Sequence, residues 1–305
     1  MPSNPLQLAL VRKISSAIGT EEKLTTPIPG LSFHRRTACS EPCSASYEPS
    51  IAVIVQGRKR VELGRNTLIY DSSRYLLTSL DLPIVSHIIE ASEAKPWLAL
   101  LLKLDMSVVR ELLGRGEIAP HPALADTPAM ATARVTAEFL GACARLVNLL
   151  DSPADIPFLS SLIQNEIIYR VLQGEAGARL RSIATLGDQS QRTAKAVAWI
   201  KTNYALPLRV DDLAHLAGMG VSTLHHHFRA LTAMSPLQYQ KQIRLHEARN
   251  RMLSGGLDAA SAAYEVGYES PSQFSREYCR FFGQPPMRDI RALRSSGAVA
   301  EDSTI

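Results

Sequence analysis

The sequence predicts an α+β protein with a small β-barrel in its N-terminal half and an all-α C-terminal part. Short runs rich in Val, Ile, Leu and Tyr follow one another between about Leu31 and Leu104. Beyond Asp105 the apolar residues recur at helical spacing instead. The last hundred residues also contain one short pattern twice, which indicates two copies of a helical motif.

The N-terminal part begins with a short helix within residues 1–24, which ends at a turn-rich break. Six strands are then predicted, at residues 50–56, 59–63, 66–70, 74–79, 83–91 and 97–104. Turn signals such as Gln56-Gly57 and Asp71-Ser72-Ser73 separate them. Closely spaced short strands of this kind are typical of a small barrel or sandwich.

Helices are predicted after Asp105, at residues 107–114, 130–150 and 156–174. The last two either pack on the barrel or form a dimer seam. The Gly/Ser/Thr-rich stretch 174–191 is the predicted linker, so the domains are 1–185 and 186–305. Seven helices follow, at about 191–203, 211–217, 221–231, 236–254, 258–266, 271–282 and 285–293.

The repeated pattern is an Ala, a Gly four residues later, a brief turn and two apolar residues four apart. Its two copies are Ala214, Gly218, Leu224 and Phe228, and Ala263, Gly267, Phe274 and Tyr278. The Ala permits close helix contact and the Gly a sharp exit from the helix, while the apolar pair seats a second helix. This pattern predicts helix-turn-helix motifs at about 211–231 and 258–282, and hence DNA binding.

The helix over 236–254 separates the two motifs. Ser235 and Gln238 form a predicted capping box around Pro236, and Gly255-Gly256 ends the helix. Its residues span about 28 Å at roughly 1.5 Å each, and adjacent major grooves lie about 34 Å apart. One chain can therefore present two recognition helices to successive grooves.

Charge is distributed unevenly along the chain. Residues 1–189 hold 19 Lys/Arg and 19 Asp/Glu, whereas residues 190–294 hold 14 Lys/Arg and 8 Asp/Glu. The excess of positive charge coincides with the repeated motif, as expected of a phosphate-facing module. Four cysteines in a chain of this length do not make a disulfide scaffold. The sequence also has no secretion signal and no apolar run of 18 residues. These observations predict a cytoplasmic protein with no membrane partner.

Helical phase separates buried from exposed positions in the two recognition helices. The outward set in the first is Ser222, Thr223, His225, His226 and Arg229, and in the second Ser272, Gln273, Ser275, Arg276 and Arg280. Gln suits adenine, Arg suits guanine or phosphate, and His can donate to guanine. Phosphate contacts, which set register without reading sequence, are predicted for Arg229, Lys241, Arg244 and Arg280.

The stretch from about Thr193 to Leu293 resembles the AraC/XylS family of bacterial transcription regulators. The motif VGYESPSQFSREYCRFFGQPP (266–286) is close to the most specific signature of that family. The segment YEPSIAVIVQGRKRVELG (47–64) resembles the N-terminal domain of one subgroup, which implies a cupin-like fold that senses a small molecule or dimerises. The resemblance implies base contacts by Ser222, His225, His226, Ser272, Gln273 and Arg276.

Three positions depart from the family pattern. Gly220 replaces a capping Ser, which weakens that cap slightly. His226 stands where Arg is common, so this groove contact is expected to be weaker and sensitive to pH. Ala233 replaces a turn Gly, and a positive φ there would impose strain.

No metal or other cofactor is predicted. Cys39 and Cys43 would need two more ligands, and consecutive histidines at 225–227 point about 100° apart on a helix. The two cysteines are interpreted as loop residues, with thiol sensing as the alternative. Cys143 and Cys279 are predicted in the core. Apolar strand residues that either line a ligand pocket or form plain core are Ile51, Val53, Val55 and Trp97.

The sequence therefore predicts a transcription regulator, an activator by family habit, and not an enzyme. Its expected partners are double-stranded promoter DNA, RNA polymerase and an unknown small-molecule effector, with a possible homodimer. Two alternatives stay open: a constitutive dimeric DNA-binding protein without a ligand, and a cupin-type enzyme with an attached DNA-binding module.

Overall fold

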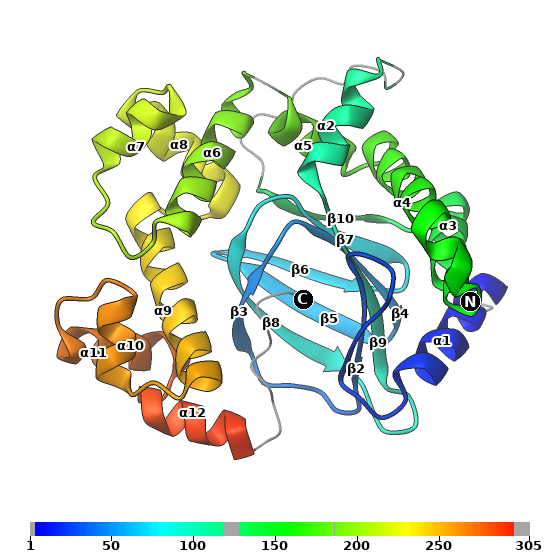
Figure 1. The fold of residues 1–305 in the computed structure, drawn as a ribbon, viewed down its shortest axis with the longest axis horizontal. Helices are drawn as coiled ribbons and strands as arrows, with labels where there is room; N and C mark the ends of the chain where they lie inside the picture. Colours follow the sequence, from blue (N-terminus) through cyan, green and yellow to red (C-terminus); the bar gives the residue numbers. More distant parts are fainter. Residues whose placement is uncertain (1–3, 117, 119–127, 186, 296–305) are drawn as a thin grey trace.

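The computed structural model describes residues 4–116, 118, 128–185 and 187–295, and its N-terminal half is built on two antiparallel sheets (Figure 1). The strands are β1 (Lys23–Thr25), β2 (Leu31–Arg36), β3 (Cys43–Tyr47), β4 (Ser50–Gln56), β5 (Arg58–Leu63), β6 (Asn66–Asp71), β7 (Arg74–Thr78), β8 (Leu82–Glu90), β9 (Trp97–Lys103) and β10 (Met130–Arg134). Their order is β1-β2-β9-β4-β7-β10 in one sheet and β3-β8-β5-β6 in the other. The described strands thus form two separate sheets in place of a closed barrel.

Strand β4 shows how the sequence generates this arrangement. It is buried along most of its length, and successive side chains point to opposite faces. Ile51 and Val53 pack toward the helices outside the sheet. Ala52 and Ile54 belong to a second apolar cluster with residues of the opposite sheet. An uninterrupted apolar run is required because both faces are covered.

Among the residues that the structure describes, five α-helices accompany the sheets. They are α1 (Pro5–Ile18), α2 (Met106–Gly114), α3 (Ala137–Asn148), α4 (Ile156–Gln173) and α5 (Gly177–Ala184), with short 3₁₀ turns at Leu149–Asp151 and Pro153–Asp155. Helices α1, α3 and α4 cover the outer face of the larger sheet, as Figure 1 shows. No helix in the described ranges has the length and apolar character needed to cross a bilayer.

Two sequence predictions in this half are wrong. The helix predicted over 130–150 begins only at Ala137, because residues 130–134 pair with β7 and Thr136 caps the helix at the amide of Phe139. The predicted linker 174–191 contains α5, whose Leu180 and Ile183 are buried. Tertiary burial makes this stretch part of the core in spite of its polar composition.

Within the described residues, the C-terminal part has seven helices, as predicted. They are α6 (Gln189–Thr202), α7 (Val210–Ala217), α8 (Val221–Thr232), α9 (Pro236–Gly255), α10 (Ala259–Glu265), α11 (Pro271–Phe282) and α12 (Pro286–Ser295). The capping box of Ser235 and Gln238 is present at the start of α9. The pairs α7–α8 and α10–α11 form two helix-turn-helix motifs, one toward each end of α9 (Figure 1).

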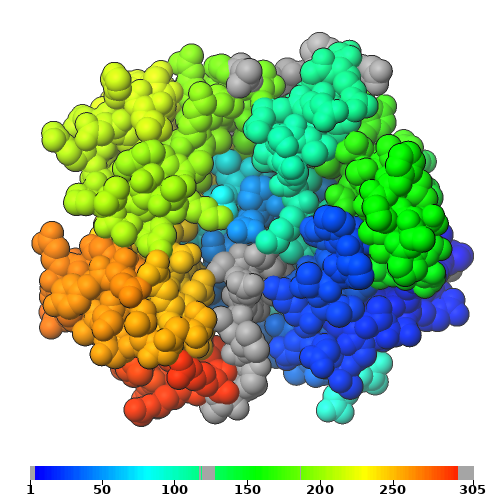
Figure 2. Space-filling view, in the orientation of Figure 1, coloured from blue at the N-terminus to red at the C-terminus, as the bar shows by residue number. Residues whose placement is uncertain are grey.

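The two motifs have different cores. Leu224 and Phe228 of the first belong to an apolar cluster that continues between the sheets. Phe274 and Tyr278 of the second belong to a separate cluster that is confined to the C-terminal helices. In the space-filling view the two helical lobes lie one above the other beside the N-terminal half (Figure 2).

Candidate DNA-binding surface and interdomain site

Helix α8 presents a polar face outward, as helical phase predicts. Its Leu224, Phe228 and Leu231 are buried. The predicted base-contact residues Ser222, His225 and His226 are all exposed, and so is Arg229, a predicted phosphate contact. The N-cap residue Gly220 offers no side chain, so no side-chain hydrogen bond caps the start of this helix.

Helix α11 is better anchored at its start. The hydroxyl of Ser270 accepts from the Gln273 amide at 3.3 Å, and Gly283 ends the helix in the left-handed region. The buried stripe is formed by Phe274 and Tyr278. All four predicted contacts on this helix are exposed, namely Ser272, Gln273, Arg276 and Arg280.

Glu277 is a residue of this surface that the sequence interpretation missed. The side-chain amide of Gln273 donates to one of its oxygens at 3.3 Å, and the Tyr268 hydroxyl donates to the other at 2.9 Å. Glu277 thereby fixes the orientation of a predicted adenine reader. The i, i+4 spacing from Gln273 is the signal that would have found it.

Arg244 is placed differently from the other predicted phosphate contacts. Its guanidinium donates to the backbone carbonyls of Tyr204 at 2.6 Å, Gly267 at 2.9 Å and Leu206 at 3.0 Å. These bonds join α9 to the loop after α6 and to the turn of the second motif. The arrangement gives Arg244 a positioning role, and its predicted phosphate contact remains untested.

The turn after α8 carries the strain expected from Ala233. Its φ is 60°, and among the described residues it is the only non-glycine with a positive φ. The turn packs on the β5–β6 turn so closely that a Cβ added at Gly64 would lie 2.7 Å from the Cβ of Ala233. The C-terminal end of a recognition helix therefore rests directly on the N-terminal half.

Charged and polar contacts reinforce this interface. The Lys201 ammonium of α6 pairs with Asp81 and lies 3.2 Å from a carboxylate oxygen of Glu48. The Tyr239 hydroxyl donates to the Asp81 carbonyl at 2.8 Å, and the Ala129 amide donates to the Leu231 carbonyl at 2.9 Å. Burial raises the pKa of Asp81, because desolvation disfavours its charged form.

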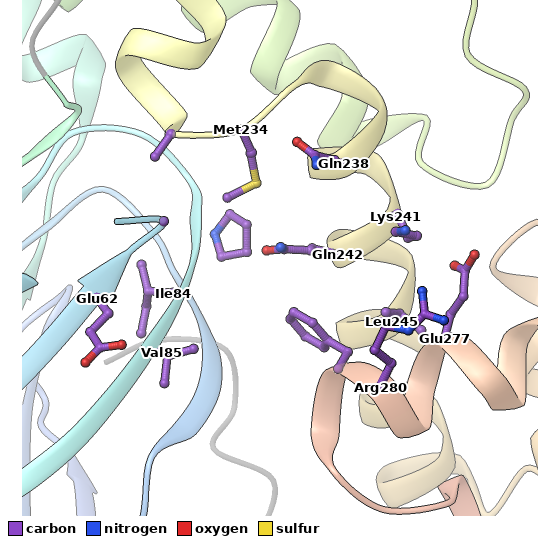
Figure 3. A pocket seen from close by; sticks show the side chains of 14 residues that line it. Glu62, Ile84, Val85, Met234, Gln238, Lys241, Gln242, Leu245, Glu277 and Arg280 are labelled. Carbon is purple, nitrogen blue, oxygen red and sulfur yellow. The ribbon is translucent and has the colours of Figure 1, made fainter. Parts of the chain in front are cut away.

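A pocket of about 450 Å³ opens between the two halves (Figure 3). Its apolar walls come from β8, from the turn between α8 and α9, and from helices α9 and α11. They include Ile84, Val85, Met234, Leu245 and Phe281. Lys241 of α9 and Arg280 of α11 also line it, and within the described ranges neither forms an ion pair. Two predicted phosphate contacts thus border a cavity that faces the N-terminal half.

The four predicted pocket residues are not brought together. Ile51, Val53 and Val55 contact the helices outside the sheet, whereas Trp97 belongs to the cluster between the sheets. All four are about 1% exposed, which matches the plain-core alternative. The Lys59 ammonium lies 5.1 Å from the Trp97 ring centroid, a cation–π distance.

The cysteines do not gather. Cys39 is exposed. Cys43 lies on strand β3 and Cys279 is half-buried on α11, so the predictions of a loop residue and of a core residue are wrong for these two. Cys143 is in the core as predicted, where burial raises the pKa of its thiol to about 12. The described residues contain no group of three or more His, Cys, Asp or Glu side chains able to hold a metal ion.

Two family models match the chain. Residues 27–179 match the model described as AraC-type transcriptional regulator N-terminus. Residues 213–292 match a helix-turn-helix domain, which covers most of both motifs.

Curated relatives match the C-terminal part. The HTH-type transcriptional activator RhaS of Yersinia pestis is 30% identical over 105 residues, which are 34% of this chain. The chain spans only 38% of the length of that activator. The HTH-type transcriptional regulator ArgR of Pseudomonas aeruginosa is 24% identical over 153 residues, which are 50% of this chain and 46% of that protein.

Solved structures of ToxT from Vibrio cholerae share the fold over most of the chain. The complex of ToxT with (E)-4-(8-methylnaphthalen-1-yl)but-3-enoic acid has a TM-score of 0.57 at 13% identity and covers 86% of this chain and 99% of that one. ToxT bound to an unsaturated fatty acid has a TM-score of 0.54 at 11% identity, covering 87% and 97% of the two chains. At these identities the likeness establishes the fold.

Proposed function

Because the chain belongs to the AraC-type transcriptional regulators, we propose that it controls a promoter by placing α8 and α11 in two successive major grooves of one duplex. Base contacts are assigned to Ser222, His225, His226, Ser272, Gln273 and Arg276. Phosphate contacts are assigned to Arg229, Lys241 and Arg280. RNA polymerase and activation enter by analogy with the RhaS activators.

The observation that carries this proposal is the exposure of both polar recognition faces on helices held by α9. This helix has 20 residues and is therefore about 30 Å long at 1.5 Å per residue. The repeat of the major groove is about 34 Å. The length of α9 is thus close to one turn of B-DNA, which supports a placement of α8 and α11 in successive grooves.

A footprint on the DNA upstream of its own gene tests the proposal. Hydroxyl-radical cleavage should show two protected stretches about one helical turn apart on the same face of the duplex. A chain carrying Gln273→Ala and Arg276→Ala should lose one stretch and keep the other. A single protected stretch, or loss of both together, contradicts the two-groove arrangement.

We further propose that the effector is an apolar molecule with a carboxylate, bound in the interdomain pocket. The pocket volume of about 450 Å³ lies in the range of small-molecule sites. Its apolar wall adjoins Lys241 and Arg280, which form no ion pair within the described ranges, and the carboxylates of Glu62 and Glu277 also line the pocket. ToxT, which shares the fold, binds ligands of this class. A carboxylate there competes with DNA phosphates for the same two cations.

Repeating the footprint with oleate tests this second proposal. Oleate should raise the protein concentration needed for protection, and Lys241→Ala should remove that dependence. Unchanged protection at all oleate concentrations favours the alternative of a constitutive dimeric regulator without a ligand.

A further inference from the structure

A second cavity adjoins the β5–β6 turn. It has a volume of about 460 Å³ and is bounded by that turn, β10 and α5. Leu63 and Arg65 line it, whereas Glu62 and Gly64 line the interdomain pocket. The two cavities therefore border the same hairpin, and no described residue lines both of them.

The charge of this cavity is entirely positive. Arg65 and Arg179 line it, and no Asp or Glu is among the described residues that do so. The Nε of Arg179 is inaccessible to solvent and has no hydrogen-bond partner in the described part of the chain. Burial lowers the pKa of Arg179, and a buried guanidinium nitrogen that lacks a hydrogen-bond partner carries an uncompensated desolvation cost.

Further hydrogen-bond donors face the same space. The Thr132 hydroxyl oxygen accepts from the Nε of Arg74 at 3.1 Å, so its own proton remains available to a ligand. Asn66 contributes an amide to the lining, and Met130 contributes an apolar surface. The lining therefore combines donors and cations with an apolar wall.

We propose that this cavity binds a small organic anion, a carboxylate on a compact apolar body. Arg179 and Arg65 would hold the carboxylate, with Thr132 as a further donor, and the body would lie against Met130. The site is separate from the interdomain pocket and does not depend on the proposed DNA contacts.

Calorimetric titration of the full chain with benzoate tests this site, with neutral benzamide as the matched ligand control. Benzoate should bind saturably and at least tenfold more tightly than benzamide. Arg179→Gln should weaken benzoate at least tenfold. Arg134→Gln should leave the affinity for benzoate unchanged. Arg134 lies on β10, the strand of Thr132, but its side chain is 79% exposed and pairs with Glu175.

Thr67→Trp keeps the test decisive if Arg179→Gln does not fold. Thr67 is exposed at the rim, so a large ring there should block benzoate while both arginines remain. The proposal is overturned if the wild-type chain does not bind benzoate, or if benzamide binds equally well. It is also overturned if benzoate binding survives in Thr67→Trp, or if Arg134→Gln loses as much affinity as Arg179→Gln.

Discussion

Arg276 is exposed on α11, and no other described residue forms an ion pair with it. Its guanidinium is therefore available to a guanine edge. Arg276→Ala should cost about 1–3 kcal/mol on the cognate operator and relax the preference at one base pair. Electrophoretic mobility shifts on cognate and randomised duplexes measure both effects.

The matched control is Arg288→Ala, which removes an exposed arginine from the neighbouring helix α12. It should change affinity for both duplexes equally, if at all. An Arg276→Ala loss of the same size on cognate and random DNA would mean that Arg276 contacts phosphate.

His246 gives the fold a dependence on pH. It is buried against the rings of Phe281 and Phe282, and burial, with a smaller effect of Arg249, lowers its pKa to about 3. The unfolded chain takes up a proton below about pH 6.5, whereas the folded chain does not. The free energy of unfolding is therefore largest above about pH 6.5. It decreases as the pH is lowered, by about 2 kcal/mol at pH 5.

His246→Phe should flatten this part of the stability curve, because Phe cannot take up the proton and fits the aromatic site. Urea unfolding of both proteins at pH 5 and pH 7.5 measures how much the free energy of unfolding changes with pH in each. His34 contributes a similar change to both proteins, so it does not affect the comparison. His225→Phe, at an exposed position, should keep the wild-type slope. An unchanged slope in His246→Phe contradicts the burial of a neutral imidazole.

At the scale of elements, the contact between the β5–β6 turn and the end of α8 is testable by a double-mutant cycle. Gly64→Ala should destabilise strongly, because Gly64 has a φ of +60° and its new Cβ would meet that of Ala233. Ala233→Gly should relieve about 1 kcal/mol of strain from its positive φ. In the double variant Gly64→Ala should cost less than in the wild type.

The coupling energy from urea unfolding should exceed roughly 0.5 kcal/mol, as found for residues in contact. Gly30→Ala is a suitable comparison, since it has a similar φ but only ordinary contacts with Lys103. Additive effects of the Gly64 and Ala233 changes would show that the two turns are apart in solution.

Elements with local signals were predicted to within a few residues. Helix α9 is an example, because its Ser235–Gln238 box and its left-handed Gly256 mark both ends in the chain itself. Strand β10 was missed because its identity depends on pairing with β7, about fifty residues earlier. Strands β2 and β3 lie within the strand-rich region predicted from about Leu31, but no separate run was predicted for either. Their identity depends on pairing with the distant strands β9 and β8.

The candidate site likewise has features that follow from local sequence signals and features that depend on long-range contacts. Exposure of the predicted base readers on α8 and α11 follows from helical phase, which is local. The carbonyl contacts of Arg244 and the pocket bordered by Lys241 depend on how distant segments meet, and no periodicity in the sequence encodes them.

At the scale of the whole molecule, helix α4 has an apolar outer face. Phe158 is 72% exposed and Leu162 is 52% exposed. We predict that this face meets the same face of a second copy across a twofold axis, since the stretch 156–165 carries no charge to oppose self-association.

Joint replacement Phe158→Glu and Leu162→Glu should give a monomer, as measured by sedimentation velocity. Tyr264→Glu is the control, because it replaces an aromatic residue of similar exposure, 59%, on α10 in the other half. An unaltered sedimentation coefficient in the α4 variant would exclude this face as the seam.

The unequal cores of the two helix-turn-helix motifs have a consequence for how an operator is used. The first motif shares its apolar cluster with the sheets, and the second does not. A shift of the sheets would therefore move the apolar support of α8 directly, whereas it would reach α11 only through the walls of the interdomain pocket, to which Arg280 and Phe281 belong. Base changes in the half-site under α11 would then alter basal occupancy, and changes under α8 would alter the amplitude of the response to a signal.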